Sequence, residues 1–218
     1  MSQESRGMKR RPMRASRAGF SLIELLAVIV ILSILITFLV TQLGKGGEVI
    51  EERACRAQLE MIAATIGEYE SEFGSYPPSR FHADWGPPPN TTNLGAEALV
   101  IALWSPEWGG SNLPEDDLFN TDGDRSKKAL TSMPTSDLLE LCDPWQNPIA
   151  YLSRSDYKRE DVYTVADPET GELMESRVKA VLNPTTGRAY EPHRFQLISA
   201  GVDGQFGTED DITNFRTR

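Results

Sequence analysis

Two sets of acidic residues occupy positions where a carboxylate needs a positively charged partner. The first is Glu24, the only ionisable residue among the 21 residues from Phe20 to Val40. A charge inside an apolar membrane helix is expensive, about 2.5–3.5 kcal/mol at the bilayer centre and less near its edge, so an acid there indicates a function. Glu24 therefore requires a cation as its partner.

The second set lies in a glycine-rich stretch near the C-terminus and contains Asp203, Asp210 and Asp211. Such a loop can bring its carboxylates and some backbone carbonyls around one hard cation. Ca²⁺ accepts about six to eight oxygen ligands with flexible geometry, which suits the loop better than Mg²⁺ does. No thiol or imidazole is nearby in the sequence, which counts against zinc. The alternative is an acidic surface turn without a metal.

The segment 20–40 that carries Glu24 is long enough to cross the roughly 30 Å apolar core of a bilayer as one helix. Six basic residues precede it and none occurs in the four residues after Val40, a distribution that keeps the N-terminus in the cytoplasm. In a secretory signal peptide a small residue follows a shorter apolar run, whereas in this chain the small residue Gly19 precedes the apolar run. The segment predicts a membrane anchor, with the rest of the chain outside.

The junction Gly19-Phe20-Ser21-Leu22-Ile23-Glu24-Leu25-Leu26 resembles the class III signal of type IV prepilins and of the pseudopilins of type II secretion. The resemblance implies that a prepilin peptidase cleaves between Gly19 and Phe20, removes the leader 1–19 and N-methylates Phe20. The new amino group then lies one helical turn before Glu24, on the same helix face. It can pair with Glu24 of its own chain or of a neighbouring subunit, and the second pairing sets the register of a filament. An ordinary anchor with a stray acid is the alternative.

Beyond the anchor, residues 48–73 predict an amphipathic helix. Apolar residues recur every three or four positions, which places them on one face. This stripe consists of Cys55, Leu59, Ile62, Ile66, Tyr69 and Phe73. The glycines in the segment 44–47 form a weak point, either a hinge or an unwound turn. The helix is expected to end at Gly74, because prolines follow.

The remainder predicts a small head with one further helix at residues 95–104 and one or two helical turns at 134–141. Strands are expected at 149–153, 161–165, 177–182 and 194–199, where β-branched or aromatic residues alternate. The connections within 79–134 are long for a compact domain, so they are either functional or partly mobile. The segment 154–192 is interpreted as an insertion.

Three further stretches, 72–78, 142–153 and 199–212, resemble the major, G-type pseudopilins of type II secretion. The resemblance implies an α+β pilin-like fold. Its long N-terminal helix has a transmembrane half (20–40) and an amphipathic half (41–74), packed on a small antiparallel sheet in a head (75–218). It also implies a C-terminal Ca²⁺ loop in which the side chains of Asp203, Asp210 and Asp211 and the carbonyls of Ala200 and Thr208 bind the ion, while Glu209 points to solvent.

Composition narrows the possible partners. The formal net charge is −10, and since the first 18 residues contribute +5, the remaining chain carries −15. This acidity argues against nucleic acid or anionic lipid as a partner of the exported part. Cys55 and Cys142 would enter an oxidising compartment, where a disulfide between them is permitted. The alternative is that Cys55 is a buried core thiol.

Other motifs are weak. The acidic turn 120–124 is similar to the middle of an EF-hand loop, but Leu118 and Ala129 stand at its first and last ligand positions. We interpret it as a solvated turn, with a weak second calcium site as the lesser alternative. His82 and His193 lie in no recognisable catalytic motif.

The resemblance thus implies a structural subunit of a type II secretion pseudopilus rather than an enzyme. Its partners would be copies of itself, other pseudopilins, the inner-membrane assembly platform and prepilin peptidase. The chain would cross the inner membrane once, with a periplasmic head, before joining the periplasmic pseudopilus. A type IV pilin or minor pseudopilin shares the anchor and is the runner-up. A membrane-anchored periplasmic enzyme is the alternative from another class.

Overall fold

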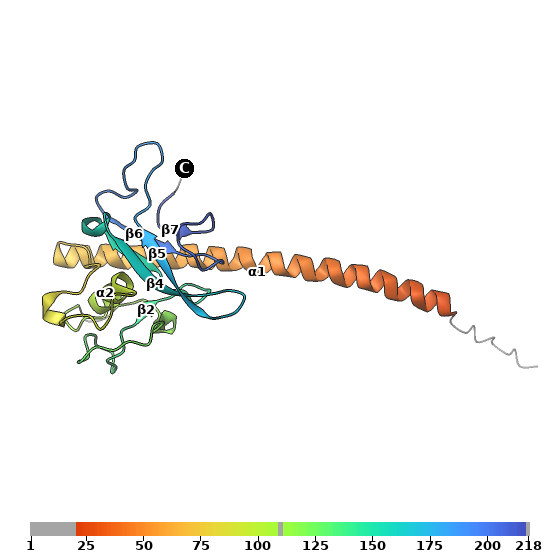
Figure 1. The fold of residues 1–218 in the computed structure, drawn as a ribbon, viewed down its shortest axis with the longest axis horizontal. Helices are drawn as coiled ribbons and strands as arrows, with labels where there is room; N and C mark the ends of the chain where they lie inside the picture. Colours follow the sequence, from red (N-terminus) through yellow and green to blue (C-terminus); the bar gives the residue numbers. More distant parts are fainter. Residues whose placement is uncertain (1–20, 109–110, 217–218) are drawn as a thin grey trace, which may run out of the picture. The chain divides into compact units, whose positions relative to one another are not determined.

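The computed structural model describes residues 21–108 and 111–216, and for residues 38–48 it describes the backbone alone. The predicted leader 1–19 and Phe20 therefore lie outside the described residues. Figure 1 shows helices together with short strands. In chain order they are α1 (Leu22–Phe73), η1 (Ala83–Trp85), α2 (Leu94–Leu103), η2 (Glu115–Asp117), β1 (Leu118–Phe119), β2 (Glu140–Leu141), β3 (Ala150–Ser153), η3 (Arg154–Asp156), β4 (Glu160–Ala166), β5 (Leu173–Lys179), β6 (Phe195–Ser199) and β7 (Ile212–Thr213).

Helix α1 ends where the sequence predicts. Gly74 adopts φ 71°, and its N–H donates to the Glu70 carbonyl at 2.8 Å, which closes the last turn. The backbone stays helical through the segment 44–47, so the alternative of an unwound turn there is wrong. The chain nevertheless divides into two compact units at this segment, one ending at Lys45 and the other beginning at Gly46.

The first unit presents apolar side chains to its surroundings. Every side chain from 21 to 37 is exposed, and the large apolar ones range from 43 % for Val28 to 83 % for Leu22. Among the residues that the structure describes, no helix combines the length and the apolar character needed to cross a membrane.

The second unit has a core on both faces of the three-stranded sheet β3-β6-β7. The first part of the core holds the predicted stripe of α1, in which Cys55, Leu59, Ile62 and Ile66 are buried. Tyr151 of β3 belongs to this part, whereas its neighbours Ala150 and Leu152 belong to the second, because successive side chains of a strand point to opposite faces. The stripe is confirmed except at its end, where Phe73 is 41 % exposed.

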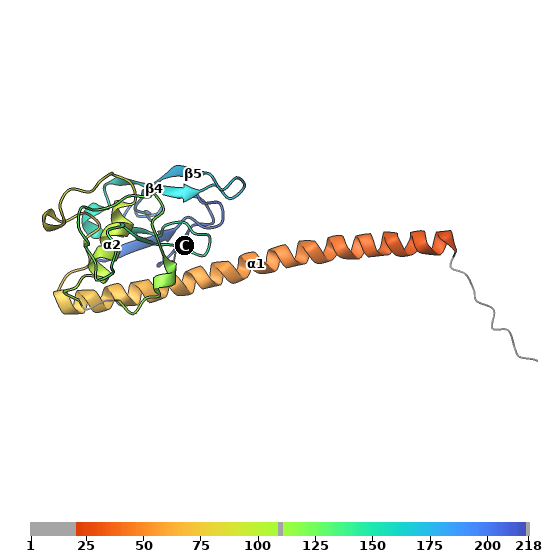
Figure 2. The ribbon, with the colours of Figure 1, turned by 90° about the horizontal axis from the view of Figure 1, so that it is seen from below.

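All the strand pairs are antiparallel. β6 lies between β3 and β7, and each of its five residues is buried. β4 and β5 form a separate hairpin with Val162 opposite Arg177. The second part of the core lies between this hairpin and the three-stranded sheet. In Figure 2 the hairpin lies farther from α1 than α2 does. Helices with small antiparallel sheets agree with the predicted α+β class.

Helix α2 confirms the prediction at 95–104 and is buried at nine of its ten positions. Its close approach to β3 depends on Gly95, because a Cβ atom at this position would lie 2.3 Å from the Tyr151 carbonyl oxygen. A helix that is apolar on nearly all sides must be surrounded by other elements. One residue breaks that pattern, Glu97, which has no exposed surface.

Two predicted elements are wrong or displaced. Residues 134–141 form no helical turn, because Glu140 and Leu141 pair with β1 and Asp137 bridges to Arg125. The strand expected at 177–182 begins earlier, at Leu173, since β5 pairs with β4 along its whole length. The other predicted strands are confirmed within one residue.

Candidate functional site

At the N-terminal site the structure describes Ser21 and Glu24, whereas Gly19 and Phe20 lie outside the described residues. The Ser21 N–H donates to Glu24 Oε2 at 2.8 Å, and the Glu24 N–H donates to Ser21 Oγ at 3.3 Å. This reciprocal pair is a capping box, which satisfies two N–H groups at the start of α1. The role of Ser21 was not predicted from the sequence, although the Ser-x-x-Glu spacing is the signature of such a cap.

The C-terminal loop spans residues 200–211, between β6 and β7. Ala200 is buried at the end of β6. Gly201 follows at φ 66°, where a Cβ atom would lie 2.4 Å from the carbonyl oxygen and 2.7 Å from Oδ2 of Asp210. The two ends of the loop therefore meet at a position that only glycine fits.

The predicted aspartates come together in this loop. Asp210 Oδ2 accepts the Asp203 N–H at 2.9 Å, and Asp210 Oδ1 accepts the Thr208 hydroxyl. Asp211 Oδ2 accepts the Gly207 N–H at 2.8 Å. Glu209 is exposed, in agreement with the expectation that it points to solvent.

The electrostatics of the loop favour a bound cation. Burial raises the pKa of Asp211 to about 6, and the negative charges of Asp210 and Asp203 add to the rise. Burial also acts on Asp210, but hydrogen bonds from Thr208 and Asp203 outweigh it and lower its pKa. Asp211 Oδ1 is buried and has no hydrogen-bond partner within the described part of the chain. The buried, unpaired Oδ1 of Asp211, beside the charges of Asp210 and Asp203, fits a hard cation.

The turn at Asp143-Pro144-Trp145 connects to this loop. Asp143 Oδ1 accepts the N–H groups of Trp145 and Asn147, each at 3.0 Å, and Oδ2 accepts the Ser199 hydroxyl at 2.6 Å. Burial raises the pKa of Asp143 to about 6, against the effect of these hydrogen bonds. Since Ser199 is the last residue of β6, the turn fixes the strand that leads into the loop.

The two cysteines do not form the disulfide that the sequence left open. Both are buried free thiols, and Cys142 Sγ donates to the Glu140 carbonyl at 3.8 Å. Burial raises the pKa of both thiols. Cys55 is a core residue beside Leu59, as the alternative reading held.

The sequence suggested that the turn 120–124 is solvated, but the structure shows that it is partly buried. Asp122 and Asp124 are half-buried and lie near Glu97 and Glu140, which have no exposed surface. Neither glutamate was predicted from the sequence as a candidate ligand. The available signal was Glu97, the only charged residue in the otherwise apolar helix α2.

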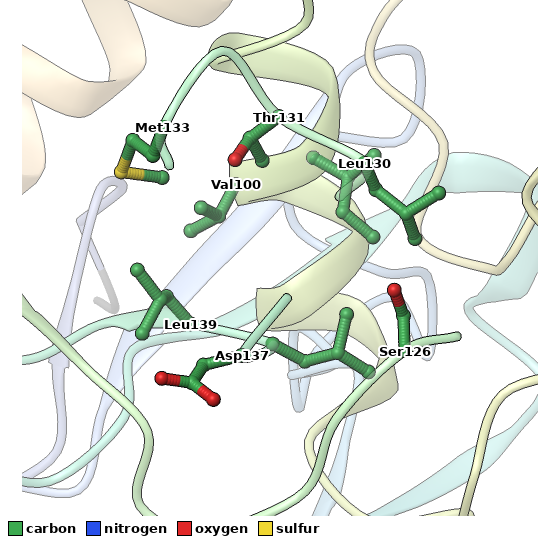
Figure 3. Close-up of a pocket in the computed structure, with 9 residues that line it drawn as sticks. Val100, Ser126, Leu130, Thr131, Met133, Asp137 and Leu139 are labelled. Atoms are coloured by element: carbon green, nitrogen blue, oxygen red, sulfur yellow. The ribbon is translucent and has the colours of Figure 1, made fainter. Parts of the chain in front are cut away.

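A small cavity lies beside α2. Figure 3 shows Val100, Leu130 and Leu139 around a cavity of about 10 Å³ between α2 and the segment 126–139. This volume is close to the minimum for one water molecule. His82 is exposed and pairs with Asp84 on the surface.

Comparisons with known proteins show what the chain is similar to. The prokaryotic N-terminal methylation motif matches residues 14–40, which include Gly19, Phe20 and Glu24. The type II secretion system core protein G of Escherichia coli is 26 % identical over 205 residues, covering 93 % of this chain and 95 % of the relative. The protein of the same name from Pseudomonas aeruginosa is 28 % identical over 72 % of this chain and 89 % of the relative.

Two other relatives are similar over shorter parts of this chain. The Vibrio cholerae core protein G is 28 % identical over 71 % of this chain and 84 % of the relative. A ComG operon protein 3 homologue of Bacillus licheniformis is 31 % identical over 28 % of this chain and 64 % of the relative. No solved structure matches the chain. The similarity to core protein G covers the head as well as the methylation motif, and the chain is therefore similar to these type II secretion proteins over most of its length.

Proposed function

We propose that the mature chain is a structural subunit of a type II secretion pseudopilus, held in the inner membrane by the first half of α1 until it joins the filament. The observation that carries the proposal is the exposed apolar surface of residues 22–36. A helix that is apolar on all sides needs a lipid or protein environment, because soluble monomers seldom expose large continuous apolar patches. Lipid supplies that environment before assembly, and neighbouring helices supply it afterwards.

Glu24 directs assembly in this proposal. Prepilin peptidase cleaves after Gly19 and leaves an N-methylated amino group on Phe20. In an apolar surrounding the Glu24 carboxylate is stable only near a positive charge. A subunit therefore enters the filament at the height where its Glu24 meets the amino group of a neighbour, while the Ser21 N–H holds one carboxylate oxygen in place.

We infer that the C-terminal loop binds Ca²⁺ through Asp203, Asp210 and Asp211 and through the carbonyls of Ala200 and Thr208. The ion neutralises the carboxylates that this loop gathers. The unpaired Asp211 Oδ1 and the close approach of Gly201 to Asp210 support this inference. The Asp143–Ser199 hydrogen bond connects the loop to the rest of the head, so the ion stabilises the surface that neighbouring subunits contact.

The proposed partners are other copies of this chain, other pseudopilins and the inner-membrane assembly platform. The function is structural rather than enzymatic, as for the core protein G relatives. A type IV pilin or a minor pseudopilin is the second candidate, since the methylation motif alone does not separate these classes.

Processing is tested by the mass of the chain made together with a prepilin peptidase. The wild-type chain should begin at N-methylated Phe20. Gly19→Val should remain full-length, because a branched side chain at the cleaved bond blocks the enzyme, and it should be absent from filaments. Gly7→Val, a glycine in the leader far from the junction, is the matched control and should be processed. Cleavage of Gly19→Val at the same bond would contradict the proposed site.

A further inference from the structure

A second group of acids lies inside the head and shares no residue with the C-terminal loop. We name it the inner acidic cluster; it consists of Glu97, Asp122, Asp124 and Glu140. Glu97 comes from α2, Glu140 from β2, and the two aspartates from the turn that follows β1. The cluster thus joins three segments that are distant in the sequence.

The carboxylate oxygens have the spacing of ligands around one ion. One oxygen each from Glu97, Asp122 and Glu140 lie within 4.8 Å of one another. Calcium binds oxygen at about 2.3–2.6 Å, so two of its ligands are at most about 5 Å apart. The three oxygens can therefore contact a single cation without a large movement.

Glu97 provides independent evidence that the cluster binds a ligand. Its side chain has no exposed surface, and neither of its oxygens has a hydrogen-bond partner among the described residues. A buried, unpaired carboxylate is strongly unfavourable, whereas a bound cation satisfies both oxygens. Asp124 Oδ1 is likewise buried and without a partner in the described chain.

Neutral groups donate hydrogen bonds to carboxylate oxygens of the cluster. Asn90 Nδ2 donates to Asp122 Oδ2 at 2.8 Å and to Asp124 Oδ2 at 3.0 Å. For Glu140, Oε1 accepts Asn93 Nδ2 at 3.0 Å and Oε2 accepts the Thr121 N–H at 2.9 Å. Hydrogen-bond donors of this kind, which contact the ligands rather than the ion, orient carboxylates around a metal.

The described contacts of the cluster include no arginine or lysine. Arg125, which follows Asp124 in the chain, pairs instead with Asp137 at 2.6 Å and is 72 % exposed. Burial raises the pKa of Glu97 to about 10 and that of Glu140 to about 8, and the neighbouring aspartates add to both rises.

We propose that the inner acidic cluster binds one divalent cation of the calcium class, with Glu97, Asp122 and Glu140 as ligands and Asp124 as a fourth carboxylate at the site. All the available ligand atoms are hard oxygens, which suit calcium rather than zinc. The ion fixes α2, the turn 120–124 and β2 to one another. The sequence motif alone could not show this site, because two of its ligands lie outside the turn.

The test counts calcium ions bound to the full-length chain in detergent. Each variant is stripped with a chelator, dialysed against buffered calcium chloride, and analysed by atomic emission for metal per chain. Glu97→Gln keeps the shape of the side chain and should bind one ion fewer than Glu115→Gln, which removes an exposed acid in η2. The same loss of one ion should appear when both variants are made on an Asp210→Ala background.

The second background separates the two sites. Asp210→Ala removes the ion of the C-terminal loop, so adding Glu97→Gln should leave no bound calcium. If Glu97→Gln and Glu115→Gln bind the same number of calcium ions per chain, the proposed inner site is wrong. This outcome does not depend on whether the C-terminal loop binds an ion. If circular dichroism shows that Glu97→Gln does not fold, Asp122→Asn replaces it, because Asp122 is at a half-exposed position. Asp122→Asn should likewise bind one calcium ion fewer than Glu115→Gln.

Discussion

At the scale of single residues, Glu24 has two separable roles. Its carboxylate accepts the Ser21 N–H and so caps α1. Its second role depends on its negative charge, which in the proposed function pairs with the amino group of Phe20 in a neighbouring subunit. Capping requires an acceptor oxygen, which glutamine also has, whereas the pairing requires the charge.

Two substitutions distinguish these roles. Glu24→Gln keeps the capping oxygen and loses the charge, and we expect it to insert into the membrane but to form few or no filaments. Ser21→Ala removes a cap worth about 1 kcal/mol and keeps the charge, and we expect it to assemble. The readout is the amount of each variant in filaments sheared from cells, relative to its amount in the membrane fraction. Wild-type filament yield from Glu24→Gln would show that the charge is not needed.

At the scale of elements, the sequence predicts most of what has a repeating pattern. The stripe on α1 has a period of about three and a half residues and β4 alternates with a period of two, whereas α2, β3 and β6 are short, mostly apolar runs. All of these elements are present. The strands β1, β2 and β7 have two residues each, too few to show a period. The C-terminal loop is local in sequence and was predictable, whereas the inner acidic cluster depends on tertiary contacts.

The turn that begins at Asp143 gives a prediction about pH. Asp143 is 4 % exposed, and burial raises its pKa from 3.8 to about 6. The folded protein therefore holds this proton more tightly than the unfolded chain, and the stability that the proton contributes is present below pH 4 and is lost as the pH rises through 6. The two pKa values differ enough for an effect on the order of 2–3 kcal/mol.

Asp143→Asn removes this titration and keeps the acceptor for the Trp145 and Asn147 N–H groups. In saturating calcium, we expect the melting temperature of Asp143→Asn to rise relative to that of the wild type between pH 4 and pH 8. Asp116→Asn, at an exposed position in η2, is the control for the loss of a negative charge. A difference between Asp143→Asn and the wild type that stays constant with pH would contradict the assignment.

At the scale of the whole molecule, the two units differ in how their apolar side chains are buried. The unit that begins at Gly46 buries its own core on both faces of a sheet. The unit that ends at Lys45 exposes apolar side chains over most of its described length and buries none of them. In the proposed function, the first unit is completed by other molecules, which are lipids before assembly and copies of the same chain afterwards.

The most direct test of this account is the composition of filaments from cells that produce the full chain together with its prepilin peptidase and assembly platform. Filaments sheared from the cells are purified, examined by electron microscopy and analysed by mass spectrometry. We expect filaments whose main subunit is this chain, beginning at N-methylated Phe20. A processed chain that remains in the membrane fraction and is absent from the filaments would contradict it.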